Sequence, residues 1–231
     1  MARPGAASQV GVGLIETMRV MGGRLPWLGR HLDRLHASIA ALGGPVAPEQ
    51  LVDRVLGGVR SGDSVVRLEL TDGHSEISTR DVNAERDVAL VVSNEPYHPY
   101  PHKTTRREQF GRALADARRR GSGASDALLV TPDGYVAEGT AWNLFWWEDG
   151  ALCTPAENIG ILPGLGRKRV MELTDVKEAR VPVAALAGRS LFLTNAVRGI
   201  VEIGVFEGKA VPRDSRTAEL AGGFWPVGDQ D

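Results

Sequence analysis

The chain has little of several features that mark special classes of protein. It contains one cysteine, Cys153, which excludes an internal disulfide. No apolar run reaches the roughly 20 residues that a membrane-spanning helix needs. A formal net charge of −2 excludes a general attraction to nucleic acids or membrane surfaces. The first residues, MARPGAASQVG, lack the apolar segment of a secretory signal, so we expect a cytoplasmic location.

What is present indicates a globular protein with both helices and strands. The 231 residues are 42% hydrophobic and 24% charged, which is enough for one large core or two modest ones. Leucine and isoleucine recur at three- and four-residue steps over residues 31–42, a pattern that predicts a helix. Alternation over 64–71 predicts a strand, and 87–93 reads as the last strand of an N-terminal domain. The fold class we expect is α+β.

The expected domains are 1–93, a linker at 94–102 and a C-terminal domain at 103–231. The linker assignment rests on three prolines and the absence of a helical or strand period. Thr105 and Glu108 have the spacing of a capping box, so a helix is predicted after the linker. Beyond it we expect antiparallel hairpins, a strand over 191–196 and a last helix over 215–221.

The most informative stretch runs from Tyr135 to Val170. It places a single acid, Glu138, among small and apolar residues, where a buried carboxylate needs a cationic or protonated partner. The Gly-rich turn at 163–166 then opens a basic helix, and the free N–H groups at a helix start bind phosphate. A surface glutamate and an ordinary helix start are the simpler interpretations. Together, the two features predict a cofactor site.

These residues resemble a known signature. Glu138, Asn143-Leu144-Phe145, Thr154-Pro155 and Leu162 to Arg167 are similar to the signature of the class IV (fold-type IV) pyridoxal-phosphate enzymes. That family contains aminodeoxychorismate lyase and the branched-chain and D-amino-acid aminotransferases. The resemblance implies an N-terminal α/β sandwich, a C-terminal barrel-like domain rich in β-strands, pyridoxal 5′-phosphate between them, and a homodimer. No metal is expected.

The resemblance also implies roles for single residues. Lys103 corresponds to the lysine that binds the cofactor covalently and then serves as general acid and base. The chain has only four lysines, and Lys103 precedes Glu138 by 35 residues, a spacing similar to the family's. Glu138 corresponds to the acid opposite the pyridine nitrogen. Arg34, in a His-x-x-Arg-Leu step, resembles the arginine that contacts the cofactor phosphate; the alternative is a solvated helix arginine.

Further cofactor contacts are expected around the phosphate. The residues concerned are Leu165, Gly166, Asn195 and Ala196. Aminotransferases often have threonine where this chain has Ala196, so we expect Asn195 to substitute for the missing hydroxyl. Asn143 is expected to organise the site without reacting.

The reaction stays open between alternatives. Three segments, 102–107, 143–146 and 194–196, resemble the corresponding segments of lyases. They favour a 4-amino-4-deoxychorismate lyase, which releases pyruvate and 4-aminobenzoate, a folate precursor. The alternative is an aminotransferase that needs a 2-oxo acid acceptor. A non-catalytic binding protein of the same fold is a third interpretation, against which the intact Lys103 and Glu138 argue. The candidates for binding substrate carboxylates are Arg19, Arg67, Arg106 and Arg198.

Overall fold

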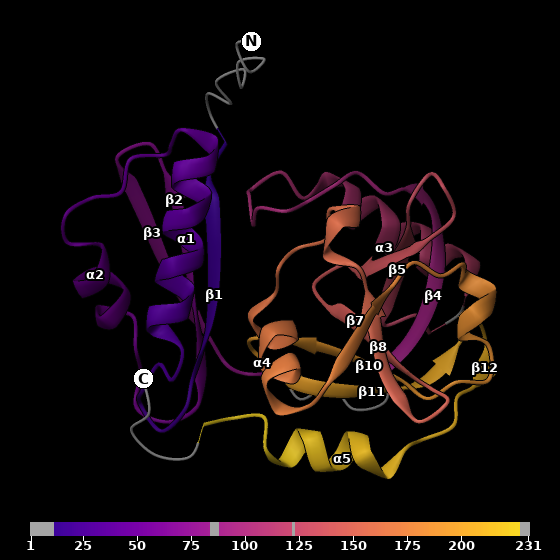
Figure 1. Ribbon diagram of the computed structural model, residues 1–231. Helices are drawn as coiled ribbons and strands as arrows, with labels where there is room; N and C mark the ends of the chain where they lie inside the picture. Colours follow the sequence, from indigo (N-terminus) through magenta and orange to yellow (C-terminus); the bar gives the residue numbers. More distant parts are fainter. Residues whose placement is uncertain (1–11, 84–87, 122, 227–231) are drawn as a thin grey trace. The chain divides into compact units, whose positions relative to one another are not determined.

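The chain folds into two compact units. A computed structural model describes residues 12–83, 88–121 and 123–226 (Figure 1). Of the described residues, the first unit comprises 12–82 and 102–106, and the second comprises 83, 88–101, 107–121 and 123–226. The chain therefore passes into the second unit after Val82, before the predicted boundary at residue 93, and Lys103 belongs to the first unit. The N-terminal residues on which the expected location rests lie outside the described residues.

The first unit is a three-stranded antiparallel sheet, with the order β1-β2-β3, packed against helices. Its elements are β1 (Leu14–Val20), α1 (Leu28–Leu42), α2 (Leu51–Gly57), β2 (Ser64–Thr71) and β3 (His74–Arg80). Leu35 of α1 shares one buried apolar cluster with Met18 and Leu68 from the sheet. The helix ends at Gly43, whose φ of 73° is the left-handed conformation that glycine adopts without steric cost. Strand β3 was not predicted from the sequence because it is an edge strand, HSEISTR, with one large apolar residue.

The second unit is built on a nine-stranded sheet that closes on itself. Its strands are β4 (Val88–Pro96), β5 (Asp126–Val130), β6 (Val136–Gly139), β7 (Asn143–Glu148), β8 (Ala151–Pro155), β9 (Val176–Ala179), β10 (Leu191–Asn195), β11 (Gly199–Phe206) and β12 (Lys209–Ala210). The order is β10-β11-β4-β5-β6-β7-β8-β9, and β7 also pairs with β10, which completes the ring. The expected barrel-like C-terminal domain is confirmed.

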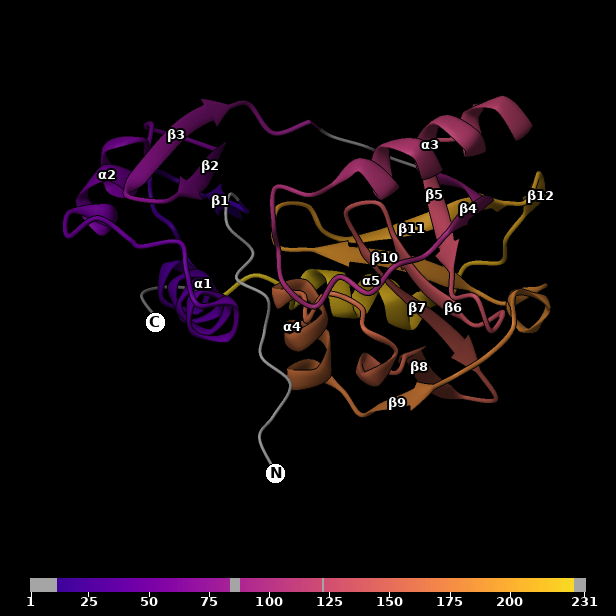
Figure 2. The ribbon, with the colours of Figure 1, turned by 90° about the horizontal axis from the view of Figure 1, so that it is seen from above.

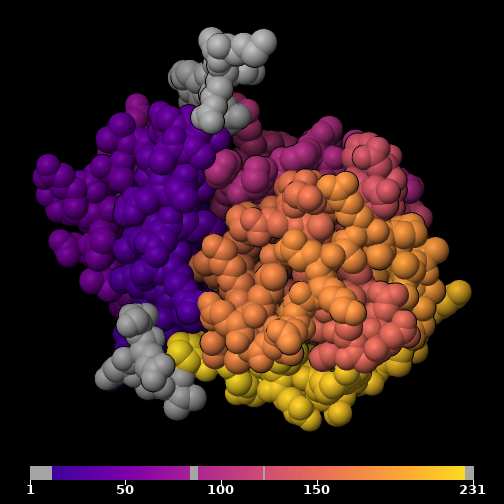
Figure 3. Space-filling view, viewed as in Figure 1, coloured from indigo at the N-terminus to yellow at the C-terminus, as the bar shows by residue number. Residues whose placement is uncertain are grey.

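Helices cover this barrel from different sides. They are α3 (Glu108–Arg120), α4 (Leu165–Leu173) and α5 (Ser215–Gly222). Figure 2 shows α3 over β4 and β5, whereas α5 lies along β11. The yellow segment that contains α5 forms part of the surface of this unit (Figure 3). Within the described residues, no helix is both long enough and apolar enough to cross a membrane.

Three predictions about local structure were wrong. Strand β4 pairs with β5 and β11, so it belongs to the second unit's sheet and does not close the first. The predicted linker is partly strand, and its Tyr97 and Tyr100 are buried. Tyr100 packs edge-on against Phe110 of α3, with ring centroids 4.9 Å apart. The capping box does not form, because the Thr105 hydroxyl accepts the Gly13 N–H at 3.0 Å instead.

Candidate functional site

A row of three polar residues crosses neighbouring strands of the barrel. Asn143 on β7 pairs directly with Glu138 on β6 and with Thr194 on β10. Directly paired residues project to the same face of a sheet, and strands lie about 4.8 Å apart, so the row spans roughly 10 Å. The side chains are buried, with 3%, 4% and 0% of their residue surface exposed for Glu138, Asn143 and Thr194. Three polar groups buried side by side need specific partners.

The backbone N–H and carbonyl of Leu162 connect two members of this row to the Gly-rich turn. Its N–H lies 3.3 Å from each oxygen of the Glu138 carboxylate. Its carbonyl oxygen accepts from Asn143 Nδ2 at 3.0 Å. Gly164 follows, and a Cβ there would come within 2.0 Å of Asn143 Oδ1. Glycine is therefore required at 164 because the Asn143 amide occupies that space.

The Gly-rich turn ends at the start of α4, where backbone N–H groups are available. Gly164 is the N-cap and provides no side-chain cap, and among the described residues the amides of Leu165 and Gly166 have no hydrogen-bond acceptor. A Cβ on Gly166 would lie 2.9 Å from the Asn195 backbone and 2.7 Å from Thr194 Oγ1. The turn after β10 thus abuts the helix start, and only glycine at 166 allows this approach.

Thr194, next to the start of α4, has a polar side-chain atom whose hydrogen-bonding capacity is not used. Its Oγ1 is buried and has no hydrogen-bond partner among the described residues. A hydroxyl beside free amides at the positive end of a helix dipole suits an anion such as a phosphate. Thr194 was named from the sequence only as part of the lyase-like segment 194–196, and it was not among the expected cofactor contacts.

Asn195 shapes the turn with its side chain. Its Oδ1 accepts from the amides of Val197 at 2.9 Å and Arg198 at 2.8 Å, and its Nδ2 donates to the Ala141 carbonyl at 3.2 Å. Both polar atoms of the side chain are therefore used locally. The backbone of Asn195 borders Gly166, and Ala196 is buried beside it.

Arg167 anchors α4 to the rest of the barrel. Its side chain is almost completely buried and contacts Glu178, Glu157 at 3.3 Å and the Pro155 carbonyl at 3.3 Å. The planar guanidinium can satisfy several acceptors at once. This anchor fixes the helix start against strand β8 and the loop that follows it.

Tyr97 is a further buried residue of this site that the sequence analysis missed. Its hydroxyl lies 2.9 Å from Glu138 Oε1 and 2.8 Å from the Gly160 carbonyl. Burial, with the neighbouring charge of Glu138, raises the pKa of the Tyr97 phenol above its usual value, so the phenol stays protonated. Tyr97 was assigned to the linker because no periodicity surrounds it.

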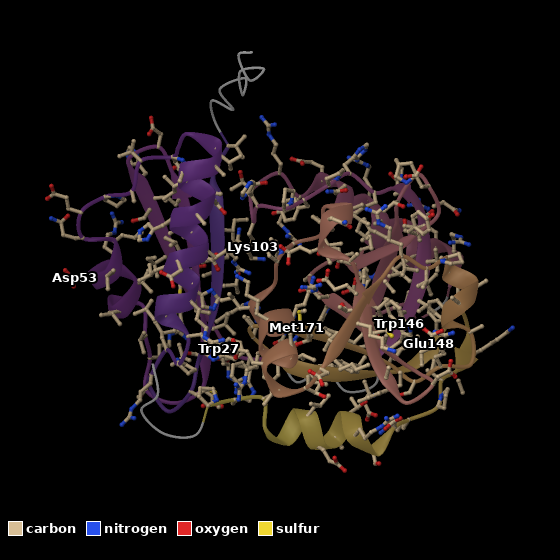
Figure 4. All side chains as sticks on the ribbon, in the orientation of Figure 1. Trp27, Asp53, Lys103, Trp146, Glu148 and Met171 are labelled. Atoms are coloured by element: carbon tan, nitrogen blue, oxygen red, sulfur yellow. The ribbon has the colours of Figure 1, made fainter. Side chains whose placement is uncertain are left out.

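Lys103 lies in the first unit, beside β1 (Figure 4). The backbone around it continues the sheet: the Lys103 carbonyl accepts from Ile15 N–H at 2.8 Å, and Thr105 N–H donates to the Gly13 carbonyl at 2.9 Å. Thr104 forms an isolated bridge with Leu14. This pairing places the lysine at a defined point along the sheet edge.

Arg34 takes part in a buried charge cluster in the same unit. Its Nε and Nη2 donate to the two oxygens of Glu16 at 2.9 and 2.5 Å, and His31 Nδ1 lies 2.6 Å from Glu16 Oε2. Burial alone would raise the pKa of Glu16, but Arg34 and His31 outweigh it and lower that pKa to about 2. Because the carboxylate is ionised, His31 Nδ1 must carry the hydrogen.

The protonation of His31 follows from the same surroundings. Burial lowers the pKa of His31 despite the attraction of Glu16, and the charges of Arg34 and Lys103 lower it further. Lys103 therefore lies within electrostatic range of this cluster. Glu16 and His31 were missed from the sequence, although an acid between Leu14 and Met18 on an inward-facing strand was a usable signal.

The predicted site residues are thus distributed over both units. Lys103 and Arg34 belong to the first unit. Glu138, Asn143, Leu165, Gly166, Asn195 and Ala196 belong to the second, which brings them together around the Gly-rich turn. Of the candidate carboxylate-binding arginines, Arg19 pairs with Asp63 and Arg67 with Glu69, whereas Arg198 lies 5.3 Å above the Trp142 ring.

Comparison with known proteins gives a consistent picture. The family model described as amino-transferase class IV matches residues 13–205. A putative branched-chain-amino-acid aminotransferase from Methanocaldococcus jannaschii is 24% identical, over 87% of this chain and 81% of that protein. Aminodeoxychorismate lyase from Bacillus subtilis is 22% identical, over 83% and 76%. The solved structure of a putative amino-acid aminotransferase from Mesorhizobium loti is 28% identical, with a TM-score of 0.74 over 84% of this chain and 99% of that chain.

Proposed function

We propose that this chain, which belongs to the class IV aminotransferase family, is a 4-amino-4-deoxychorismate lyase. Members of the family use pyridoxal 5′-phosphate. The observation that carries the cofactor assignment is the row from Glu138 to Thr194. At one end it offers a buried carboxylate, and at the other an unpartnered hydroxyl next to free helix amides. A cofactor with a basic ring nitrogen and a phosphate fits such a row.

Each residue of the row has a distinct task in this proposal. The Glu138 carboxylate holds a proton at the pyridine nitrogen. The amides of Leu165 and Gly166 and the Thr194 hydroxyl hold the phosphate. When bound, the cofactor supplies an electron-withdrawing ring that stabilises negative charge on a substrate carbon. Asn143 keeps the Gly-rich turn in place through Leu162.

Two residues of the first unit complete the proposal. Lys103 attaches the cofactor and, as a free amine, removes the proton from the substrate carbon that bears the amino group. Such general acid and base catalysis typically contributes about 10²–10⁴-fold. Arg34 adds a permanent positive charge for the phosphate, and Glu16 orients its guanidinium by binding Nε and Nη2.

The lyase reaction is favoured by residues of this same row. Asn143 to Trp146 and Thr194 to Ala196 resemble the corresponding segments of lyases, and the Bacillus subtilis relative carries that name. After the proton is removed, the C–O bond to the enolpyruvyl group breaks. The enolpyruvate that leaves takes up a proton on its methylene carbon to become pyruvate, and the ring becomes aromatic as 4-aminobenzoate. The reaction needs no second substrate.

An aminotransferase is the second candidate. The relative from Methanocaldococcus jannaschii and the structure from Mesorhizobium loti are both named as aminotransferases. That reaction uses the same lysine and acid but requires a 2-oxo acid as acceptor. From the family we also propose that the protein is a homodimer and that it is cytoplasmic. Size-exclusion chromatography with light scattering measures the oligomeric state.

One assay separates the two candidate reactions. Protein loaded with pyridoxal phosphate is given aminodeoxychorismate generated in situ, without any oxo acid. Pyruvate and 4-aminobenzoate are expected in equal amounts. If neither forms, while an amino acid and 2-oxoglutarate yield glutamate, the enzyme is an aminotransferase.

A lysine variant tests the attachment residue. Lys103→Ala should lose both the visible absorbance of the bound cofactor and its attachment to the chain after borohydride reduction. Lys209→Ala removes an exposed lysine and serves as the matched control, which should keep both signals. Attachment retained in Lys103→Ala would assign the role to another lysine. A wild-type protein without either signal would support the non-catalytic alternative.

A further inference from the structure

Tyr97 holds the carboxylate on which the proposed cofactor site depends. The residue is 1% exposed, and its hydroxyl approaches Glu138 Oε1 at 2.9 Å across 41 residues of sequence. The same hydroxyl lies 2.8 Å from the Gly160 carbonyl, and the Tyr100 backbone N–H also approaches it. Glu138 and the Gly160 carbonyl are both acceptors, and a phenol has one proton to donate.

The proton goes to Glu138 for two reasons. A carboxylate is the stronger acceptor because its bond to the donor is charge-assisted. The Gly160 carbonyl already accepts the Tyr100 N–H at 2.7 Å, so it is satisfied without the phenol. The O–H of Tyr97 is therefore directed at Glu138, and the raised pKa of the phenol keeps this donor protonated.

A second donor approaches Glu138 from the loop beside Tyr97. Leu162 N–H lies 3.3 Å from both carboxylate oxygens, and Leu162 follows Gly160 by two residues. This loop packs closely on residues 97–100, as Gly160 shows: a Cβ added there would lie 2.6 Å from Pro99 Cβ. Tyr97 and Leu162 therefore both donate to the carboxylate, and the segments that carry them pack on each other.

We propose that Tyr97 is a positioning residue of the cofactor site, which orients the Glu138 carboxylate and keeps it anionic opposite the cofactor's ring nitrogen. This inference rests on the proposed function, because it assigns Tyr97 to the same site. Tyr97 does not touch the reacting atoms. Its effect passes entirely through Glu138, and that restriction makes it testable.

The experiment measures pyridoxal phosphate binding to the cofactor-free protein by absorbance and by quenching of tryptophan fluorescence. Tyr97→Phe should weaken binding about tenfold to a hundredfold, the range expected for losing a hydrogen bond to a charged group. Tyr100→Phe is the matched control, since it removes a phenol from the same apolar cluster as Tyr97. It should bind the cofactor as the wild type does.

A double-mutant cycle with Glu138→Gln supplies the decisive comparison. In the Glu138→Gln background, Tyr97→Phe should have little further effect, since there is no carboxylate left to hold. The pH at which the bound cofactor changes its visible absorbance should also shift in Tyr97→Phe and not in Tyr100→Phe. An equal loss in both backgrounds, or wild-type binding by Tyr97→Phe, would overturn the inference.

Two further outcomes keep the test complete. If Tyr97→Phe does not fold, site-specific 3-fluorotyrosine at position 97 keeps the shape and strengthens the donor. It should shift the same absorbance transition, and the absence of a shift would contradict the proposal. Failure of the wild-type protein to bind pyridoxal phosphate would instead refute the proposed function itself, together with the inference that rests on it.

Discussion

Among single residues, Leu162 has a role that its side chain does not reveal. Its backbone N–H donates to Glu138 and its carbonyl accepts from Asn143, so the backbone of one residue connects both side chains to the Gly-rich turn. A shift of the Leu162 backbone would disturb its contacts with both Glu138 and Asn143. Asn143 donates to the Leu162 carbonyl at 3.0 Å, and its organising role stays a prediction.

Replacing Asn143 with alanine should therefore weaken cofactor binding without removing a group that touches the cofactor. We expect Asn143→Ala to lower pyridoxal phosphate affinity about tenfold and to cost about 1–2 kcal/mol of unfolding free energy, because the Leu162 carbonyl loses its donor. Absorbance titration and urea denaturation measure the two effects. Asn158→Ala is the control, since Asn158 is exposed and should change stability by less than about 0.5 kcal/mol. Unchanged affinity in Asn143→Ala would show that the turn holds without it.

At the scale of elements, the phosphate site depends on how closely the turn after β10 approaches α4. Gly166 makes this approach possible, since the Asn195 backbone lies 2.9 Å from the position of an added Cβ. Arg167, the next residue, is buried, and its guanidinium binds Glu157 and so holds the helix in place. Space and anchoring together define the position of the free amides.

Gly166→Ala should force the turn and the helix apart. We expect a loss of about 1–3 kcal/mol in unfolding free energy, as for other overpacked sites, and weaker cofactor binding. Gly111→Ala is the contrasting variant, because Gly111 lies inside α3 with open space around its Cα. That change should raise stability by about 0.5–1 kcal/mol, since alanine is the better helix former. Denaturation curves of both variants check the pair, and tolerance of alanine at 166 would contradict the packing argument.

For the whole molecule, the charge cluster of the first unit makes stability depend on pH. The pKa of His31 is lowered in the folded protein from its ordinary 6.5, so the unfolded chain binds a proton first as the pH falls. The pKa of Glu16 is lowered from 4.5 to about 2, so the unfolded chain again binds its proton first. Both groups therefore contribute stability at neutral pH that is lost on acidification.

We expect the unfolding free energy to decline below pH 6.5 through His31, and to decline further between pH 4.5 and about pH 2 through Glu16. The Glu16 contribution is about 3 kcal/mol, given 1.36 kcal/mol for each unit of pKa difference. Urea denaturation over a pH series measures it. Glu16→Gln should cost about 3–5 kcal/mol at neutral pH, because Arg34 stays buried without its partner, and should flatten the acidic part of the profile. An unchanged slope in that variant would assign the acid sensitivity to other groups.

The sequence by itself determined what depends on neighbouring residues. The apolar period of α1, the Gly-rich start of α4 and the hairpin of β7 and β8 were all predicted, since each is encoded in a short stretch. The signature around Glu138 identified the family and its cofactor, because these residue types at these spacings are rare together.

The tertiary structure decided everything that joins distant parts of the chain. Tyr97 meets Glu138 across 41 residues, and Arg34 meets Glu16 across 18. The sequence predicted that Thr105 caps α3, but its hydroxyl accepts a hydrogen bond from the N–H of Gly13, 92 residues away. Strand β4 likewise joined the barrel because β5 and β11 offered it hydrogen-bond partners on both edges. Such choices depend on which groups folding brings within reach of one another, and a linear pattern contains no record of that distance.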